Sequence, residues 1–175
     1  MTSKFTIRLA SQADLDLLVN FRIALMRELG DLKDDTEVKI MEPKFRNYIA
    51  TKMRNKELFC WLIDYDTKVA CTGMAIIYDA PPQSSTHGGK EGYIFGIYTI
   101  PEMRGKGLGS LMMKHIIKHL KEQGYNNIWL RASKYGKPIY EKLGFVTSRQ
   151  GCCEYMELAS NADISKIAAG ILPKC

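Results

Sequence analysis

Short apolar segments rich in β-branched and aromatic residues recur along the chain and predict the strands of a sheet. We expect strands over residues 5–10, 58–65, 69–78, 93–100 and 126–133. A short polar segment separates the second of these from the third, which predicts a hairpin and antiparallel pairing. Residues 145–158 predict two more strands, joined by a turn near Gly151.

Between the first two strands, apolar residues follow a helical period. Ser11, with Asp14 three residues later, is typical of a helix N-cap with an acidic first turn. Apolar residues then recur at helical spacing until Gly30, where the predicted helix ends. A polar loop is expected over 31–39, and a second helix over 43–56.

Two further helices are expected in the second half of the chain. One begins at a glycine-rich turn and ends at about Gln123, and a shorter one within 135–144 closes at Gly144. Residues 79–92 are rich in Pro, Gly and Ser and predict a surface loop of the kind that often borders a site. Gly96, inside a strong strand pattern, indicates a bulge or a close backbone approach.

The predicted order β-α-α-β-β-β-α-β-α-β-β indicates one mixed α/β domain of the α+β kind, built around a single sheet. We expect this domain to span 1–158, followed by a weakly helical C-terminal tail over 159–175. The chain has 175 residues, of which 46% are hydrophobic and 25% charged, so its size and composition are those of an ordinary globular domain.

Composition argues against several classes of protein. No window approaches the roughly 18 consecutive apolar residues of a membrane span, and the first ten residues lack the apolar core of a secretory signal. We therefore expect a cytoplasmic protein without a membrane partner. The five cysteines lack C-x-x-C spacing, so neither a disulfide framework nor a zinc site is expected.

Charge and histidine spacing add two further expectations. The net charge of +6 favours an anionic ligand weakly, but the lysines are scattered rather than gathered, so no nucleic-acid partner is expected. His115 and His119 have the spacing of metal ligands on a helix. The segment between them lacks the Glu of H-E-x-x-H, no third ligand is evident, and we expect no metal.

The glycine-rich turn carries the clearest functional signal. Glycine is a poor helix former, yet three glycines occupy alternate positions where a helix begins: Gly105, Gly107 and Gly109. The first N–H groups of a helix have no intrahelical partner, and the helix dipole makes them attractive to an anion. Glycines let a phosphate approach this backbone closely. Arg104 and Lys106 add positive charge, and the hydroxyl of Ser110 can donate one more hydrogen bond.

The pattern therefore favours binding of a pyrophosphate or similar anion over a plain loop-to-helix turn. It is not a P-loop, because Gly107 rather than Ser or Thr follows Lys106. A Rossmann fingerprint fits poorly, because the next strand ends in Ser133 rather than in an acidic residue.

The sequence resembles the GNAT superfamily of acyl-CoA-dependent N-acetyltransferases. Residues 104–109, Arg-Gly-Lys-Gly-Leu-Gly, match that family's R/Q-x-x-G-x-G/A pyrophosphate loop. Residues 132–145, ASKYGKPIYEKLGF, resemble its second cofactor segment, and 7–18 resemble its first strand and helix. The resemblance extends to about residue 158.

The resemblance implies a fold and a cofactor. The fold is a mixed, mostly antiparallel central sheet of six to seven strands, flanked by about four helices, in which the central strands 93–100 and 126–133 splay apart. Acetyl-CoA is the implied cosubstrate, and its pantetheine would lie in the gap like an added strand. Ser133 would lie nearby. The main chain of Ile97, Tyr98 and Thr99 would pair with the pantetheine amides, and the pyrophosphate would be held by the backbone of Gly105, Lys106, Gly107, Leu108, Gly109 and Ser110, beside Arg104.

The implied reaction is direct attack of an amine on the thioester in a ternary complex. Tyr140 matches the position of the family's general acid; the alternative is a core aromatic residue on a short helix. A strand N–H near Tyr98 would stabilise the oxyanion. Glu91 matches the catalytic Glu of the histone-acetylating branch of the family. The alternative is that Glu91 is a solvated carboxylate at the end of the 79–92 loop and that an ordered water serves as the base.

The sequence thus predicts an N-acetyltransferase that acts on a primary amine of a small molecule or peptide. One alternative is a regulatory module that binds acetyl-CoA without turnover, and another is a nucleotide-binding protein that uses the same glycine turn. Dimerisation is common in the resembled family, so a homodimer is a further implication.

Overall fold

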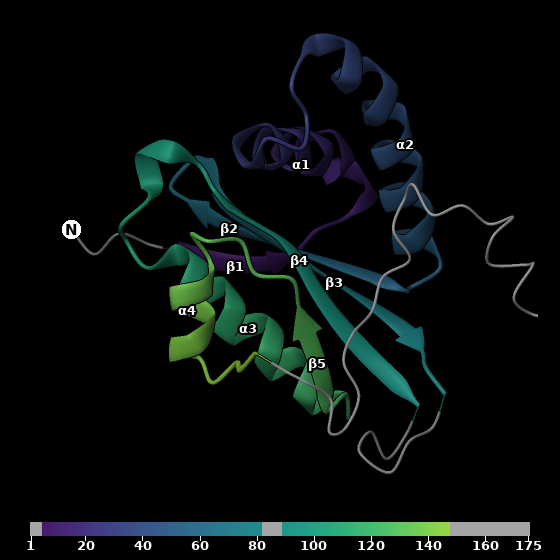
Figure 1. The fold of residues 1–175 in the computed structure, drawn as a ribbon, viewed down its shortest axis with the longest axis vertical. Helices are drawn as coiled ribbons and strands as arrows, with labels where there is room; N and C mark the ends of the chain where they lie inside the picture. The colour runs from purple at the N-terminus through teal and green to yellow at the C-terminus, as the bar shows by residue number, and fades with distance from the viewer. Residues whose placement is uncertain (1–4, 82–88, 148–175) are drawn as a thin grey trace, which may run out of the picture. The chain divides into compact units, whose positions relative to one another are not determined.

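A mixed sheet with helices on both faces forms the described part of the chain (Figure 1). The computed structural model describes residues 5–81 and 89–147. In these residues the sheet has five strands in the order β1-β2-β3-β4-β5, and all neighbours are antiparallel except β4 and β5, which are parallel. The strands are β1 (Phe5–Leu9), β2 (Leu58–Tyr65), β3 (Lys68–Asp79), β4 (Lys90–Thr99) and β5 (Asn127–Leu130).

The helices divide between the two faces of the sheet, α1 and α2 on one and α3 and α4 on the other (Figure 1). Two short 3-10 turns, η1 (Gln12–Asp14) and η2 (Pro101–Met103), precede α1 and the glycine turn. The α-helices are α1 (Leu15–Leu29), α2 (Asp35–Arg54), α3 (Leu108–Glu122) and α4 (Lys137–Lys142). The chain divides into two units, Met1–Phe145 and Val146–Cys175, and all of these elements lie in the first.

Each face of the sheet has its own apolar core. Leu18 and Val19 of α1 and Ile49 of α2 are buried against one face. On the other face α3 buries the residues that share one side of it: Met112, Met113, Ile116 and Leu120. Complete burial of each such side chain contributes about 1.5–3 kcal/mol. Gly73 of β3 permits the close packing of α3, because a Cβ at this position would lie 2.7 Å from side-chain atoms of both Ile116 and Met112.

The start of the first helical segment confirms the prediction from Ser11 and Asp14. The Ser11 hydroxyl accepts a hydrogen bond from the N–H of Ala13 at 3.2 Å, and the Asp14 carboxylate accepts one from the N–H of Ser11 at 2.8 Å. These reciprocal bonds form a capping box that satisfies donors at the helix start. The helix ends at Gly30, whose φ of 79° is left-handed.

The predicted start of the second helix was wrong. The α2 helix begins at Asp35, within the expected 31–39 loop, because the Asp34 carboxylate caps it by accepting from the N–H of Glu37 at 2.9 Å. Pro43 lies inside this helix rather than at its first turn. A proline inside a helix costs about 3 kcal/mol, and packing of α2 against α1 and β2 outweighs this cost.

Strand lengths also differ from the expectations. The β3 strand reaches Asp79 and β4 begins at Lys90, so the predicted 79–92 loop is shorter. The β5 strand covers Asn127–Leu130 rather than 126–133. The expected six to seven strands are not confirmed: the described residues have five, 145–147 are not strand, and the remaining part of 145–158 and the 159–175 tail lie outside the described residues.

The middle of β4 has the irregularity that Gly96 predicted. Gly96 has a φ of 64°, and the register between β3 and β4 shifts beside it, between Thr72 and Met74, so the bulge is confirmed. Pairing between β4 and β5 ends at Ile94 opposite Leu130. Beyond this point the β5-facing edge of β4 has no strand partner among the described residues, as the expected separation of these strands requires.

Candidate functional site

The glycine turn leaves the start of α3 accessible. Gly105 and Gly107 have φ values of 76° and 77°, and a Cβ at either position would meet no atom within 4 Å. Gly107 is the N-cap of α3, and no side chain of the described residues caps the helix. The first N–H groups of α3 therefore lie behind exposed, side-chain-free backbone, which is the arrangement that an anion needs for close approach. We find the predicted turn with the geometry that the glycine pattern indicated.

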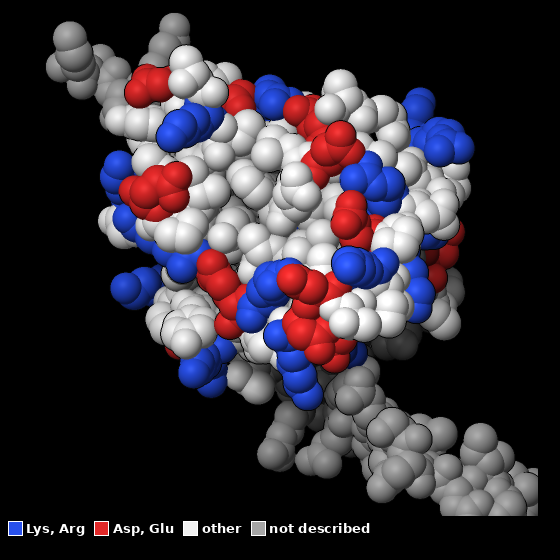
Figure 2. Space-filling view, turned by 90° about the horizontal axis from the view of Figure 1, so that it is seen from above, with Lys and Arg blue, Asp and Glu red and all other residues white. Residues whose placement is uncertain are grey.

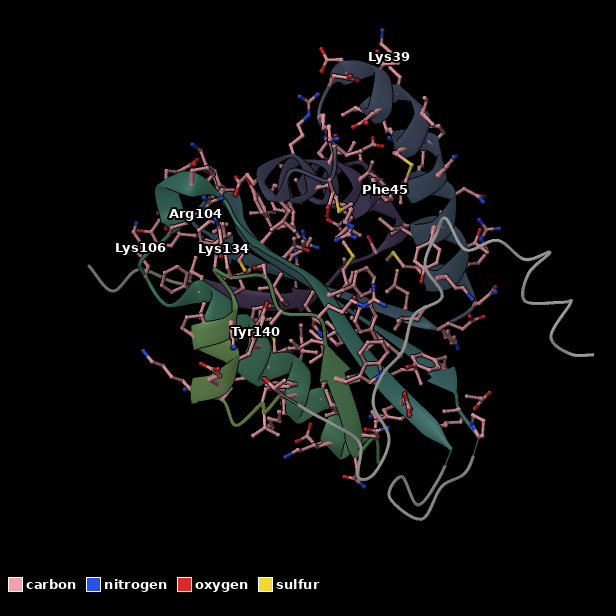
Figure 3. The ribbon with its side chains drawn as sticks, in the orientation of Figure 1. Lys39, Phe45, Arg104, Lys106, Lys134 and Tyr140 are labelled. Atoms are coloured by element: carbon pink, nitrogen blue, oxygen red, sulfur yellow. The ribbon has the colours of Figure 1, made fainter. Side chains whose placement is uncertain are left out.

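The Arg104 side chain is held by α1 rather than extended toward the turn. Its terminal Nη2 donates to both carboxylate oxygens of Glu28, at 2.7 and 2.8 Å, and its Nε donates to the carbonyl of Thr99 at 3.0 Å. Its guanidinium carbon lies 5.5 Å from the ring centre of Tyr98, whose hydroxyl also donates to Glu28 at 3.1 Å. Arg104 thus connects the end of β4 to α1, near Lys106 in Figure 3.

The edge of β4 expected to pair with pantetheine is open in part. On the β3 side, Tyr98 and Thr99 pair with Thr72 and Cys71. On the other side no strand pairs with Ile97, Tyr98 or Thr99 among the described residues, although the Thr99 carbonyl already accepts from Arg104. The N–H of Ile100 donates to the Ala70 carbonyl of β3 at 3.0 Å, and the alternation of an antiparallel ladder therefore turns the main-chain groups of Tyr98 toward β3 as well. Ile97 and Thr99 face the other edge, and Ile97 remains the better placed main-chain partner for an extended ligand.

Ser133 lies at the start of α4. Its hydroxyl accepts a hydrogen bond from the N–H of Gly136 at 3.1 Å, and its carbonyl accepts from the N–H of Lys137 at 2.9 Å. Ser133 therefore shapes the turn between β5 and the helix that carries Tyr140.

Tyr140 lies on α4, on the α3 face of the sheet (Figure 3). Its ring contacts Phe145 at 6.1 Å between ring centres, and it covers Gly136 so closely that a Cβ there would lie 2.7 Å from the ring. Burial, and to a smaller extent the Tyr93 phenol, raises the pKa of Tyr140 above its usual value near 10. The phenol therefore keeps its proton at neutral pH.

Glu91 joins three strands through its carboxylate. One oxygen accepts from the Tyr78 hydroxyl at 2.7 Å and from the Trp129 indole N–H at 3.0 Å, and the other accepts from the Asn127 amide at 2.6 Å. Burial, followed by the hydrogen bond to Glu91, raises the pKa of Tyr78 to about 12. The carboxylate is fixed in one orientation at the start of β4.

Three groups at this site were missed in the sequence. Glu28 lies 76 positions from Arg104, and no local pattern links them. Tyr93 and Trp129 have ring centres 4.3 Å apart, but in the sequence each has the pattern of an ordinary strand residue. Arg22, described below, gave one weak signal, since it interrupts an apolar stretch of α1 between Phe21 and Ile23.

His115 and His119, which lie one helical turn apart, pack against aromatic residues of β2. Their rings contact Trp61, with ring centres 6.0 and 5.1 Å apart, and His119 also contacts Phe59. Within residues 5–81 and 89–147, no three His, Cys, Asp or Glu side chains gather as metal ligands would. None of the helices in these same ranges has the length and apolar character required to cross a membrane.

Surface charge on the face shown in Figure 2 is mixed. Lys and Arg side chains alternate there with Asp and Glu side chains, and no single sign covers it. The net charge of +6 is therefore not expressed as a basic patch on this face.

Comparison with known proteins identifies relatives of the same kind. The [ribosomal protein bS18]-alanine N-acetyltransferase of Haemophilus influenzae is 39% identical over 57 residues, which are 31% of this chain and 39% of that protein. An uncharacterized N-acetyltransferase of Gracilaria tenuistipitata is 36% identical over 58 residues, 33% of this chain and 32% of that protein. The match thus spans well under half the length of these curated relatives.

Solved structures extend the similarity to most of the chain. A predicted acetyltransferase of Clostridium acetobutylicum, solved with acetyl-CoA, has a TM-score of 0.79 and 28% identity, with 89% of this chain and 96% of that chain covered. A GCN5-related N-acetyltransferase of Ralstonia eutropha shares the fold, with a TM-score of 0.77, 24% identity and coverage of 87% and 99%.

The family model described as Acetyltransferase (GNAT) family matches residues 24–145. This range contains the bulged β4 strand, the glycine turn, α3 and α4, which together form the site described above. The chain therefore belongs to the acetyltransferase (GNAT) family.

Proposed function

We propose that this protein transfers the acetyl group of acetyl-CoA to a primary amine of a small molecule or peptide, by direct attack within a ternary complex. One observation carries the proposal: the side-chain-free start of α3 adjoins the β4 edge that loses its partner after Ile94. A helix start that attracts phosphate and a strand edge that attracts amides match the two halves of a CoA molecule.

The residues present suit acetyl-CoA. Backbone amides from Gly105 to Ser110 would hold the pyrophosphate, because no Cβ at Gly105 or Gly107 blocks the approach and no side chain caps α3. The main chain of Ile97, which faces the open edge of β4, would pair with the pantetheine amides as an added strand does. When bound, acetyl-CoA supplies a thioester carbonyl that an amine can attack.

Three groups of the chain serve the reaction. Tyr140, protonated at neutral pH, donates a proton to the leaving sulfur. A main-chain N–H of β4 near Tyr98, on the open edge of the strand, stabilises the oxyanion. Glu91 takes the proton of the amine, directly or through a water, from a carboxylate that Tyr78, Asn127 and Trp129 hold in place. These three hydrogen bonds favour a fixed Glu91 carboxylate that acts as a base over a solvated side chain.

The test is release of free CoA thiol from acetyl-CoA in the presence of amines, polyamines, aminoglycosides, amino acids and peptide N-termini. We expect amine-dependent release together with acetyl-CoA binding that calorimetry detects. Binding of acetyl-CoA with no release across this panel would favour a regulatory module. Absence of acetyl-CoA binding would contradict the proposal altogether.

A further inference from the structure

Arg22 of α1 combines partial burial with the lack of a carboxylate partner among the described residues. Its guanidinium is partly buried, and this burial lowers the pKa of the side chain. Within residues 5–81 and 89–147, no acceptor lies at hydrogen-bond or ion-pair distance from it; Asp31 acts on it electrostatically without pairing. By contrast, four other arginines form ion pairs with carboxylates: Arg8, Arg27, Arg46 and Arg104.

Aromatic rings surround the Arg22 guanidinium. Its central carbon lies 5.7 Å from the ring centre of Phe45 on α2 and 5.6 Å from that of Phe95 on β4. Phe95 stacks on Tyr93, with ring centres 5.5 Å apart and planes inclined by 8°. Rings attract the cation, but they do not accept its in-plane N–H groups as carboxylate or phosphate oxygens do. The N–H groups of Arg22 are not among the fully buried atoms that lack a partner in the described residues, so an anion that arrives from solvent can accept from them. Charge-assisted hydrogen bonds to such an anion are stronger than neutral ones.

The position of Arg22 relates it to the reaction. Phe95 is the first β4 residue beyond the end of pairing with β5, so the guanidinium lies where the edge of β4 becomes open. Phe95 packs with the core on the α1 and α2 face, whereas Tyr140 packs with the core on the opposite face. Tyr93 acts electrostatically on both Arg22 and Tyr140. Arg22 and Tyr140 therefore lie on opposite faces of the sheet.

We infer that the acceptor of this enzyme carries an anionic oxygen group, a carboxylate or a phosphate, near its amine, and that Arg22 binds this group. The inference rests on the proposed function and names its acceptor class. With the anionic group held by Arg22 on the α1 face, the amine points to the open edge of β4. Its nitrogen forms the new C–N bond as the C–S bond breaks. Glu91 takes the proton that the amine loses, Tyr140 gives a proton to the sulfur that leaves as the CoA thiol, and exchange with solvent restores both side chains.

The experiment compares amines in pairs that differ in their anionic group: each standard amino acid and its C-terminal amide, and O-phosphoethanolamine and ethanolamine. Rates of thiol release are measured for the wild-type protein, Arg22→Met, Arg22→Lys and the control Arg54→Gln. Met keeps an unbranched apolar stem between the rings but removes the charge, so the fold is retained and thermal unfolding checks it. Arg54 is exposed and forms no ion pair within the described residues.

We expect the anionic member of a pair to be preferred at least tenfold in kcat/KM. Arg22→Met lowers kcat/KM for that member at least tenfold and leaves the neutral member and the KM of acetyl-CoA nearly unchanged. Arg22→Lys restores part of the preference, and Arg54→Gln behaves as wild type. Preference in the amino-acid pairs identifies a carboxylate, and preference in the ethanolamine pair identifies a phosphate.

Equal rates within every pair, or equal losses for both members in Arg22→Met, would overturn the inference. If no amine releases thiol, calorimetry measures binding of the same amines to the protein loaded with acetyl-CoA. Equal affinities for anionic and neutral members, or for wild type and Arg22→Met, overturn it as well. Failure of acetyl-CoA itself to bind is a separate result, which contradicts the proposed function rather than the role of Arg22.

Discussion

The Arg104 guanidinium donates to both carboxylate oxygens of Glu28, at 2.7 and 2.8 Å, and this pair joins the glycine turn to α1. Both side chains are partly exposed, at 46% and 41%, and an exposed pair of this kind contributes at most about 1 kcal/mol. The side chain that the sequence assigned to the anion thus serves first to hold the turn in place.

This pair yields a test of what Arg104 does. We expect Glu28→Gln and Arg104→Gln each to weaken acetyl-CoA binding by roughly two- to fivefold, because about 1 kcal/mol corresponds to a factor of about five. The double variant should be no weaker than either single variant, since both remove one interaction. Calorimetric titration with acetyl-CoA measures all three. A much larger loss in Arg104→Gln than in Glu28→Gln would show direct contact between Arg104 and the cofactor.

The role of the glycine turn is tested against a matched glycine elsewhere. Gly107 and Gly30 have φ values of 77° and 79°, and a Cβ at either would meet nothing within 4 Å. Gly107→Ala and Gly30→Ala should therefore destabilise the protein equally, by about 1–2 kcal/mol. Only Gly107→Ala should weaken acetyl-CoA binding, and Gly107→Val should weaken it tenfold or more. Chemical unfolding and acetyl-CoA titration provide the two measurements; unaltered affinity in Gly107→Val would contradict the assignment of the turn.

Tyr140 is expected to act on the rate rather than on binding. Tyr140→Phe should lower kcat at least tenfold and change the KM of acetyl-CoA little, because the leaving sulfur loses its proton donor. Since burial raises the pKa of this phenol, activity that depends on its protonated form should persist to pH values above 10. Steady-state kinetics over a pH series measures both effects.

Gly136 offers a control that displaces Tyr140 without removing it. A Cβ at residue 136 would lie 2.9 Å from the phenol oxygen and 2.7 Å from the ring. Gly136→Ala should therefore lower kcat in the wild-type background and add nothing in the Tyr140→Phe background. Additive losses in the double variant would mean that Gly136 acts through another group.

A test of Glu91 must distinguish a catalytic base from a carboxylate that only links β3, β4 and β5. Glu91→Gln should lower kcat at least tenfold, because the amide cannot take a proton. Tyr78→Phe removes one donor to the same carboxylate and should affect stability more than kcat. If Glu91→Gln lowers the melting temperature but leaves kcat unchanged, the carboxylate only ties β3, β4 and β5 together.

Asp14 predicts how stability depends on pH. The hydrogen bond from Arg8, opposed in part by burial, lowers the pKa of Asp14 from 3.8 to about 2. A carboxyl with a lowered pKa stabilises the folded state fully above its ordinary pKa and loses this effect as pH falls through the lowered value. Asp14→Asn should thus be less stable than wild type by about 1 kcal/mol at neutral pH, and the difference should shrink between about pH 4 and pH 2. Urea unfolding across this range measures it, with Asp79→Asn as the control for loss of one charge.

Local chemistry explains which parts of the fold were predictable. The Ser11 N-cap, the Gly30 stop, the Gly96 bulge and the glycine turn follow from residues close together in the chain, and each was found as predicted. The start of α2 was mispredicted because Pro43 is a strong local signal that long-range packing overrides. The ends of β3, β4 and β5 depend on their partners in the sheet, which no local pattern specifies.

The sequence by itself determined the glycine turn and the helix that follows it, and with them the resemblance to the family, because both are formed by consecutive residues. Only the tertiary structure decided what surrounds the reactive groups. It placed Glu28 against Arg104 and brought Tyr78, Asn127 and Trp129 into hydrogen-bonding contact with Glu91. It also placed Arg22 between the rings of Phe45 and Phe95. The physical reason is that burial, hydrogen bonding and electrostatic pairing act between atoms close in space, and in a folded sheet such atoms come from residues far apart in the chain.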